Sequence, residues 1–94
     1  MIGVLTVHLH LAACSSLKEK RGRIKPVLAR LRREFNVGVA EVGMQDSWQD
    51  AVISCVTVGN EGAFVQSALS SVLAWIRGNW PDGMVEDQHI ELVA

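Results

Sequence analysis

The chain has 94 residues, 49% of them hydrophobic and 20% charged, so it is long enough to form one domain with its own core and too apolar for a disordered chain. Its formal net charge of −1 hides an uneven distribution, because residues 16–35 carry eight basic and two acidic side chains (+6) and the rest of the chain carries −7. A concentrated basic segment in an otherwise acidic protein is typical of a surface that meets a polyanion.

Residues 2–11 alternate between apolar and other side chains, which predicts a strand with one buried face. The side expected in the core carries Leu5, Val7, Leu9 and Leu11. His8 and His10 lie on the opposite side, and their spacing places both imidazoles on one face.

A helix is predicted to begin after Ser16, since Ser16 and Glu19 have the spacing of a capping box. Its apolar stripe consists of Leu17, Ile24, Leu28, Leu31 and Phe35. Pro26 lies inside this helix and predicts a kink or a late start, because proline lacks the amide donor. Asn36 is expected to end the helix in the left-handed conformation.

The second half of the chain predicts a hairpin, a helix and a strand. The expected elements are strands at 37–42 and 51–58, a helix from the N-cap Asn60 to about Arg77, and a last strand at 84–93. The resulting order, strand-helix-strand-strand-helix-strand, predicts a single ferredoxin-like α+β domain over residues 1–94, with a four-stranded antiparallel sheet and both helices on one face. That fold serves many functions, so it does not indicate one.

Three segments resemble a known family: HLHLAACSS, SLKEKRGRIKPVLARLRREFNVGVAEV and QDSWQDAVISCVTVG. They are similar to a family of small uncharacterised bacterial proteins, the YlxP-like proteins, over roughly residues 1–76. The resemblance implies a ferredoxin-like fold. Genes of this family often lie among those for translation initiation and ribosome maturation, near ribosome-binding factor A, which implies a connection to RNA or the ribosome. It implies no catalytic residues.

The positive charges of the first helix fall into two arcs at about 100° per residue. The arc beside the apolar stripe contains Lys18, Arg21, Lys25 and Arg32, with Arg33 just beyond it. The arc on the other flank contains Arg23 and Arg30. Lys20 falls close to the stripe, so its side chain must extend to the surface, or the first turn is irregular.

These arcs predict contact with the phosphate backbone of RNA. The expected strands contain no aromatic residue, so we expect RNA binding to read phosphate or shape rather than bases. The alternatives are a solvated helix, docking onto the protein's own acidic loop at Asp46 and Asp50, a second subunit, or an acidic protein partner.

The open face of the sheet carries two further hypotheses. His8, His10 and His89 are weak candidates for a zinc-class site beside Asp87 and Glu91, although polar side chains on an open sheet face are the commoner reason for such histidines. The same face is expected to carry Val4, Thr6, Val39, Ile53, Cys55, Thr57 and Val85. Since that surface is too apolar to be fully solvated, we expect a homodimer through the open sheet face.

Enzymatic motifs are absent from the sequence: it has no nucleophile elbow, Walker loop or glycine fingerprint, and Cys14 has no paired base. Trp48, in the acidic loop 43–50, either folds back onto the core or anchors a partner. We therefore expect a cytoplasmic, non-enzymatic protein without a cofactor or membrane contact that binds RNA or the ribosome, or alternatively a protein-interaction module.

Overall fold

The computed structural model describes residues 1–80 and 85–93. The elements are β1 (Ile2–His10), α1 (Leu17–Glu34), β2 (Gly38–Gly43), β3 (Asp50–Val58), α2 (Gly62–Asn79) and β4 (Val85–Val93). Their order confirms the ferredoxin-like α+β fold.

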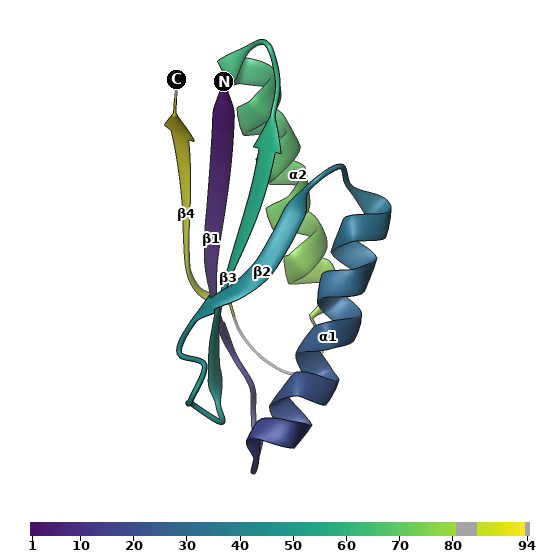
Figure 1. The fold of residues 1–94 in the computed structure, drawn as a ribbon, viewed down its shortest axis with the longest axis vertical. Coiled ribbons are helices and arrows are strands. Elements are labelled where there is room, and N and C mark those ends of the chain that lie inside the picture. Colours follow the sequence, from purple (N-terminus) through teal and green to yellow (C-terminus); the bar gives the residue numbers. More distant parts are fainter. Residues whose placement is uncertain (81–84, 94) are drawn as a thin grey trace.

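All four strands belong to one antiparallel sheet in the order β2-β3-β1-β4, and both helices cover the same face of it (Figure 1). Helix α2 packs against β1 and its two neighbours, whereas α1 lies beside β2, at one side of the sheet. The two chain ends lie together at one end of the molecule, and the start of α1 and the β2–β3 turn lie at the other end.

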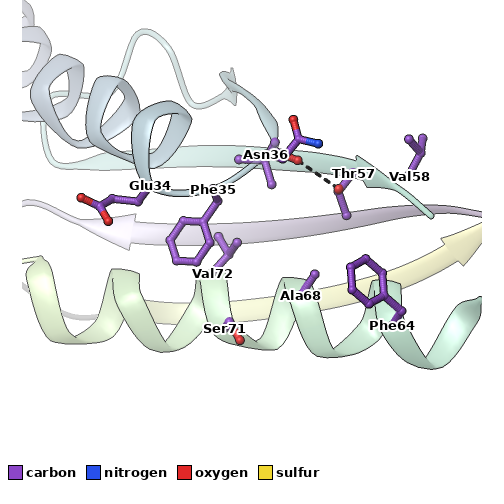
Figure 2. Close-up of a pocket in the computed structure, with 10 residues that line it drawn as sticks. Glu34, Phe35, Asn36, Thr57, Val58, Phe64, Ala68, Ser71 and Val72 are labelled. Atoms are coloured by element: carbon purple, nitrogen blue, oxygen red, sulfur yellow. Dashed lines mark hydrogen bonds between the residues drawn. The ribbon is translucent and has the colours of Figure 1, made fainter.

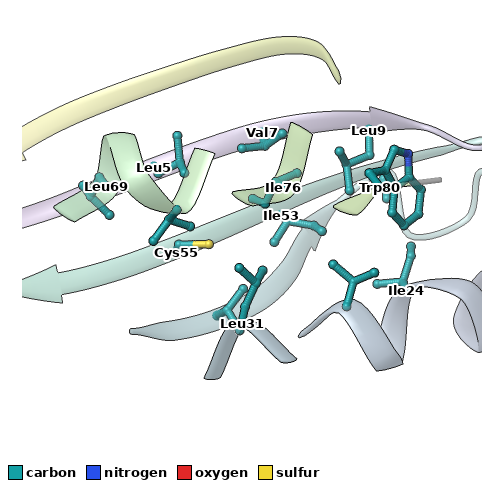
Figure 3. Packing of buried hydrophobic residues seen from close by; sticks show 14 of the residues in the cluster. Leu5, Val7, Leu9, Ile24, Leu31, Ile53, Cys55, Leu69, Ile76 and Trp80 are labelled. Atoms are coloured by element: carbon teal, nitrogen blue, oxygen red, sulfur yellow. The ribbon is translucent and has the colours of Figure 1, made fainter. Parts of the chain in front are cut away.

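The core lies between the sheet and the two helices (Figure 3). The predicted inward residues of β1 are confirmed, since Leu5, Val7 and Leu9 are fully buried. Each such side chain contributes about 1.5–3 kcal/mol of hydrophobic stabilisation. Gly3 lies where α2 approaches β1 closely, because a Cβ at this position would lie 2.3 Å from Val65 Cγ1.

The start of α1 has the predicted cap, and its later features differ from expectation. Ser16 Oγ accepts a hydrogen bond from the Glu19 amide at 3.0 Å, and Glu19 Oε2 accepts one from the Ser15 amide at 2.7 Å. The helix continues through the exposed Pro26 to Glu34, so the late start was wrong.

Two predicted caps were also wrong. Asn36 does not close α1 in the left-handed region; instead Phe35 is extended and its amide donates to the Leu31 carbonyl at 3.0 Å. At α2 the N-cap is Glu61 rather than Asn60, and the Glu61 carbonyl accepts from the Val65 amide at 3.1 Å.

Most of the residues predicted on the open sheet face lie on the other side. Val39, Ile53 and Cys55 are buried in the core, where Cys55 is opposite Leu5 and Ile53 is opposite Val7. Consecutive apolar residues in β3 left its facing undetermined, and the prediction was off by one residue. Thr57 follows the same alternation to the core side.

Val85 was misplaced for a different reason. A register shift after His8 leaves Val85 opposite Leu9, and Val85 packs against the core. An irregularity of this kind inserts one residue and reverses the facing beyond it, which a period of two cannot foresee. Val4 and Thr6, by contrast, alternate with the buried residues of β1 as predicted.

Candidate nucleic-acid interface

The cationic residues of α1 differ in exposure and in whether they have partners within the protein. The exposed positions are Lys18, Arg21, Lys25, Arg30, Arg32 and Arg33. Within residues 1–80 and 85–93, no hydrogen bond or ion pair engages Lys18, Arg21, Lys25 or Arg33. We call these four residues the free cationic face; their charges are available to an external anion.

Three of the predicted phosphate-binding arginines also contact other parts of the protein. Arg32 donates to the Val39 carbonyl at 2.8 Å, which ties α1 to β2. Arg23 donates to the Ala12 carbonyl at 2.8 Å. The Arg30 guanidinium lies 5.0 Å from the ring centroid of Trp75 on α2, at cation–π distance. Both arginines of the second arc therefore contact other parts of the fold, whereas Arg32 is the one residue of the first arc with such a contact among the described residues.

Lys20 is the residue of α1 whose burial the sequence did not predict. It is 1% exposed, so it neither extends to the surface nor distorts the first turn. Its ammonium nitrogen donates to the carbonyls of Met44 at 2.7 Å and Ser47 at 2.8 Å, and it lies 2.9 Å from Glu41 Oε2. Its position next to the apolar stripe could have indicated this burial, because a lysine can be buried where carbonyl oxygens accept its hydrogen bonds.

The lysine holds a β2–β3 turn with two exposed apolar side chains. Met44 has a left-handed backbone (φ 56°) and is 50% exposed, and Trp48 is 54% exposed. The first of the two roles considered for Trp48, a ring folded back onto the core, is therefore not met. Its role as a partner anchor stays a prediction.

The basic helix does not form ion pairs with Asp46 or Asp50 of the acidic loop among the described residues. Among the described residues its buried ion pair is with Glu41 on β2, and Asp46 is exposed. Asp50 begins β3 and binds two histidines of β1 instead.

The histidines meet that carboxylate on the open sheet face. His8 Nε2 lies 2.9 Å from Asp50 Oδ1, and His10 Nδ1 lies 3.5 Å from the same oxygen. The hydrogen bond from His8, followed by that from His10, holds the pKa of Asp50 below its ordinary value. His89, opposite Thr6, lines a 240 Å³ hollow with His8 and Asp87. Within the described ranges, no group of three or more histidine, cysteine or acidic side chains is arranged to hold a metal ion.

A cleft of about 360 Å³ opens between the end of α1, the end of β3 and α2 (Figure 2). Two aromatic side chains line it, Phe35 directly after α1 and Phe64 on α2. Two of its polar side chains already have partners: the Thr57 hydroxyl donates to the Asn36 carbonyl at 3.0 Å, and the Ser71 hydroxyl donates to the Ser67 carbonyl at 3.1 Å. The other polar residues that line the cleft are Glu34 and Asn36, and the rest of its lining is apolar.

Neither cysteine has the environment of a nucleophile. Burial raises the pKa of the Cys14 thiol and raises that of Cys55 to about 11. The thiolate is the reactive species, so both sites disfavour it at neutral pH. In the described part of the chain, no helix has an apolar segment of membrane-spanning length. The homodimer stays a prediction.

Comparison with known proteins places these features in a family. Residues 2–89 match the family model described as "Protein of unknown function (DUF503)". The chain is also 36% identical over 76 residues to the "Uncharacterized protein YlxP" of Bacillus subtilis (strain 168), an alignment that covers 81% of this chain and 83% of that protein. The resemblance found in the sequence is thus confirmed, and the chain belongs to the DUF503 family of YlxP-like proteins.

Proposed function

We propose that this protein is a non-enzymatic accessory protein that binds the phosphate backbone of RNA, on the ribosome or during its maturation, through helix α1. The observation that carries the proposal is the free cationic face. Lys18, Arg21, Lys25 and Arg33 are exposed and lack partners among the described residues, on a chain whose net charge is −1.

The geometry of this face suits a polyanion better than a single small anion. Lys18 to Arg33 span 15 helical steps at about 1.5 Å each, so the charges extend over about 22 Å along one side of α1. The long side chains are unconstrained, which suits repeated phosphates rather than one precisely shaped ligand. Contacts of this kind give affinity that falls as salt rises, without reading sequence.

The contacts of three other cations of α1 with the rest of the fold support the same interpretation. Lys20 and Arg32 hold α1 on the hairpin and on β2, and Arg30 stacks on Trp75. The fold therefore needs some of the positive charges of α1, and it leaves four in water. A cation without a hydrogen bond or ion pair among the described residues can contact an external anion at little cost to the fold.

The test is fluorescence anisotropy with labelled ribosomal RNA fragments over a salt series. About four phosphate contacts predict a slope of log affinity against log salt of roughly −3 to −4. The variant Arg21→Gln/Lys25→Gln/Arg33→Gln removes three of the four charges, so we expect the slope to fall to about −1 and the affinity at low salt to fall by at least an order of magnitude.

A matched control separates a local site from net charge. The variant Gln66→Glu/Ser67→Glu/Ser70→Glu changes the net charge by the same three units at exposed positions of α2. We expect it to bind nearly as the wild type does. Equal losses in the two variants, or no binding of RNA at low salt, would contradict the proposal. If an acidic protein binds and RNA does not, the interaction-module alternative is correct.

A further inference from the structure

The β2–β3 turn is fixed to the start of the cationic helix. Lys20 lies two residues from Lys18 and one residue from Arg21, and its buried ammonium group donates to the carbonyls of Met44 and Ser47. Trp48 follows Ser47 directly. Although this turn is far from α1 in sequence, the backbone next to Trp48 is therefore held against the first turns of α1.

Strand β2, which leads into the turn, contacts α1 near both ends of the helix. Arg32 reaches the Val39 carbonyl and Lys20 reaches Glu41, both on β2. Arg21 and Lys25 lie on the helix between these two contacts and belong to the same arc as Arg32. The first arc of charges thus lies on the side of α1 that contacts β2, the strand that leads into the turn.

Trp48 differs from the other two tryptophans in its surroundings. Trp80 is 6% exposed and its indole nitrogen donates to the His10 carbonyl at 3.2 Å. Trp75 packs edge-on against Phe35 with ring centroids 6.3 Å apart, and it also carries the Arg30 guanidinium. Trp48, by contrast, is 54% exposed and has no ring contact or hydrogen bond among the described residues.

An exposed indole on a turn that is bound to the start of the cationic helix fits one ligand chemistry. An unpaired nucleotide offers a negative phosphate and an apolar ring face that stacks on aromatic side chains. A duplex supplies the phosphate but keeps its bases stacked inside.

We propose that Trp48 stacks on an unpaired base of the RNA whose phosphates contact the free cationic face. This inference rests on the proposed function and extends it, because it makes single-stranded RNA the preferred ligand. The absence of aromatic residues from the strands led us to expect no contact with bases. This inference changes that expectation, because the aromatic side chain lies on a turn rather than on the sheet.

The experiment uses three probes with the full chain: a single-stranded oligoadenylate, an RNA duplex of equal length, and heparin, a polyanion without bases. Base stacking on one aromatic side chain changes affinity by about 5- to 100-fold. We therefore expect Trp48→Ala to weaken binding of the single strand by that factor and to leave heparin within about 2-fold. Trp48→Phe, which keeps an aromatic face, should restore most of the loss.

The outcomes separate the two proposals. If Arg21→Gln/Lys25→Gln/Arg33→Gln loses binding to all three probes and Trp48→Ala loses only the single strand, both proposals hold. If the triple variant loses all three and Trp48→Ala binds the single strand as the wild type does, the phosphate-binding function stands and the stacking role is wrong. If the triple variant binds all three probes as the wild type does, the proposed phosphate-binding function is wrong, whatever the effect of Trp48→Ala.

A second variant tests whether the contacts of Lys20 with the β2–β3 turn position Trp48. Lys20→Met/Glu41→Leu replaces the ion pair by apolar side chains, a change that folded proteins often tolerate. We expect heparin binding within about 2-fold of the wild type and a loss of single-strand preference that approaches the loss in Trp48→Ala. An unchanged preference in a folded double variant would overturn the claim that Lys20 positions Trp48.

Discussion

The two helices have equal length and cover the same face of the sheet, yet they are held by different interactions. Helix α2 buries four apolar side chains, Val65, Leu69, Val72 and Ile76, all fully inaccessible. Helix α1 buries three apolar side chains, and its fourth buried residue is Lys20.

This difference shows how a small protein can place a highly charged helix on its own core. With less apolar surface to bury, α1 depends on directed contacts to carbonyls and to one aromatic ring, made by Lys20, Arg23, Arg30 and Arg32. Hydrogen bonds fix orientation more sharply than apolar contact, which is not directional. The consequence is a free cationic face that points outward in a defined direction.

The largest expected effect concerns Lys20, the buried charged residue that distinguishes α1 from α2. Lys20→Ala removes the donor from two carbonyls and leaves Glu41, whose side chain is 21% exposed, without its cation. Breaking a buried pair costs about 3–5 kcal/mol, and the partial exposure of Glu41 places our expectation near 3 kcal/mol. Urea denaturation followed by circular dichroism measures it.

Leu69→Ala on α2 is the matched control for that measurement, since a fully buried leucine costs about 2–5 kcal/mol when truncated. We expect the two variants to lose comparable stability, one through a charge and the other through a cavity. A loss below about 1 kcal/mol for Lys20→Ala would mean that apolar packing alone holds α1.

Much of this architecture was readable from the sequence, because it follows local rules. The alternation in β1, the Ser16 cap and the order of elements all depend on neighbours in the chain. The facing of β3 was not readable, since apolar residues at consecutive positions such as Val52 and Ile53 satisfy either face. The contacts of Lys20 with the β2–β3 turn could not be predicted from the sequence either, because the acceptors are backbone carbonyls 24 and 27 residues away.

A smaller effect concerns the open sheet face, away from both helices. Hydrogen bonds from His8 and His10 hold the pKa of Asp50 below its ordinary value of 3.8. The carboxylate therefore contributes stability that is present above about pH 4 and is lost as pH falls through the lower pKa of the folded state. Because the Asp50 side chain is 32% exposed, the contribution stays below about 1 kcal/mol.

Thermal denaturation of the wild type and Asp50→Asn at pH 6 and pH 3 checks this linkage. We expect the wild type to be the more stable protein at pH 6 and the difference to narrow at pH 3. Asp46→Asn, at an exposed position of the turn, serves as the control and should show no such change. A difference that is the same at both pH values would mean that the ionised form of Asp50 contributes nothing to folding.

The smallest effect tests the division within α1 itself, at two neighbouring arginines. Arg32 donates to the Val39 carbonyl at 2.8 Å, whereas Arg33 has no hydrogen bond or ion pair with any described residue. Both are exposed, so Arg32→Gln should cost about 0.5 kcal/mol and Arg33→Gln close to nothing in urea denaturation. The order should reverse for RNA, because the Arg33 side chain is free to meet a phosphate while Arg32 is partly committed to β2. Equal effects of the two variants on both stability and RNA affinity would show that the bound and free cations of α1 are not functionally distinct.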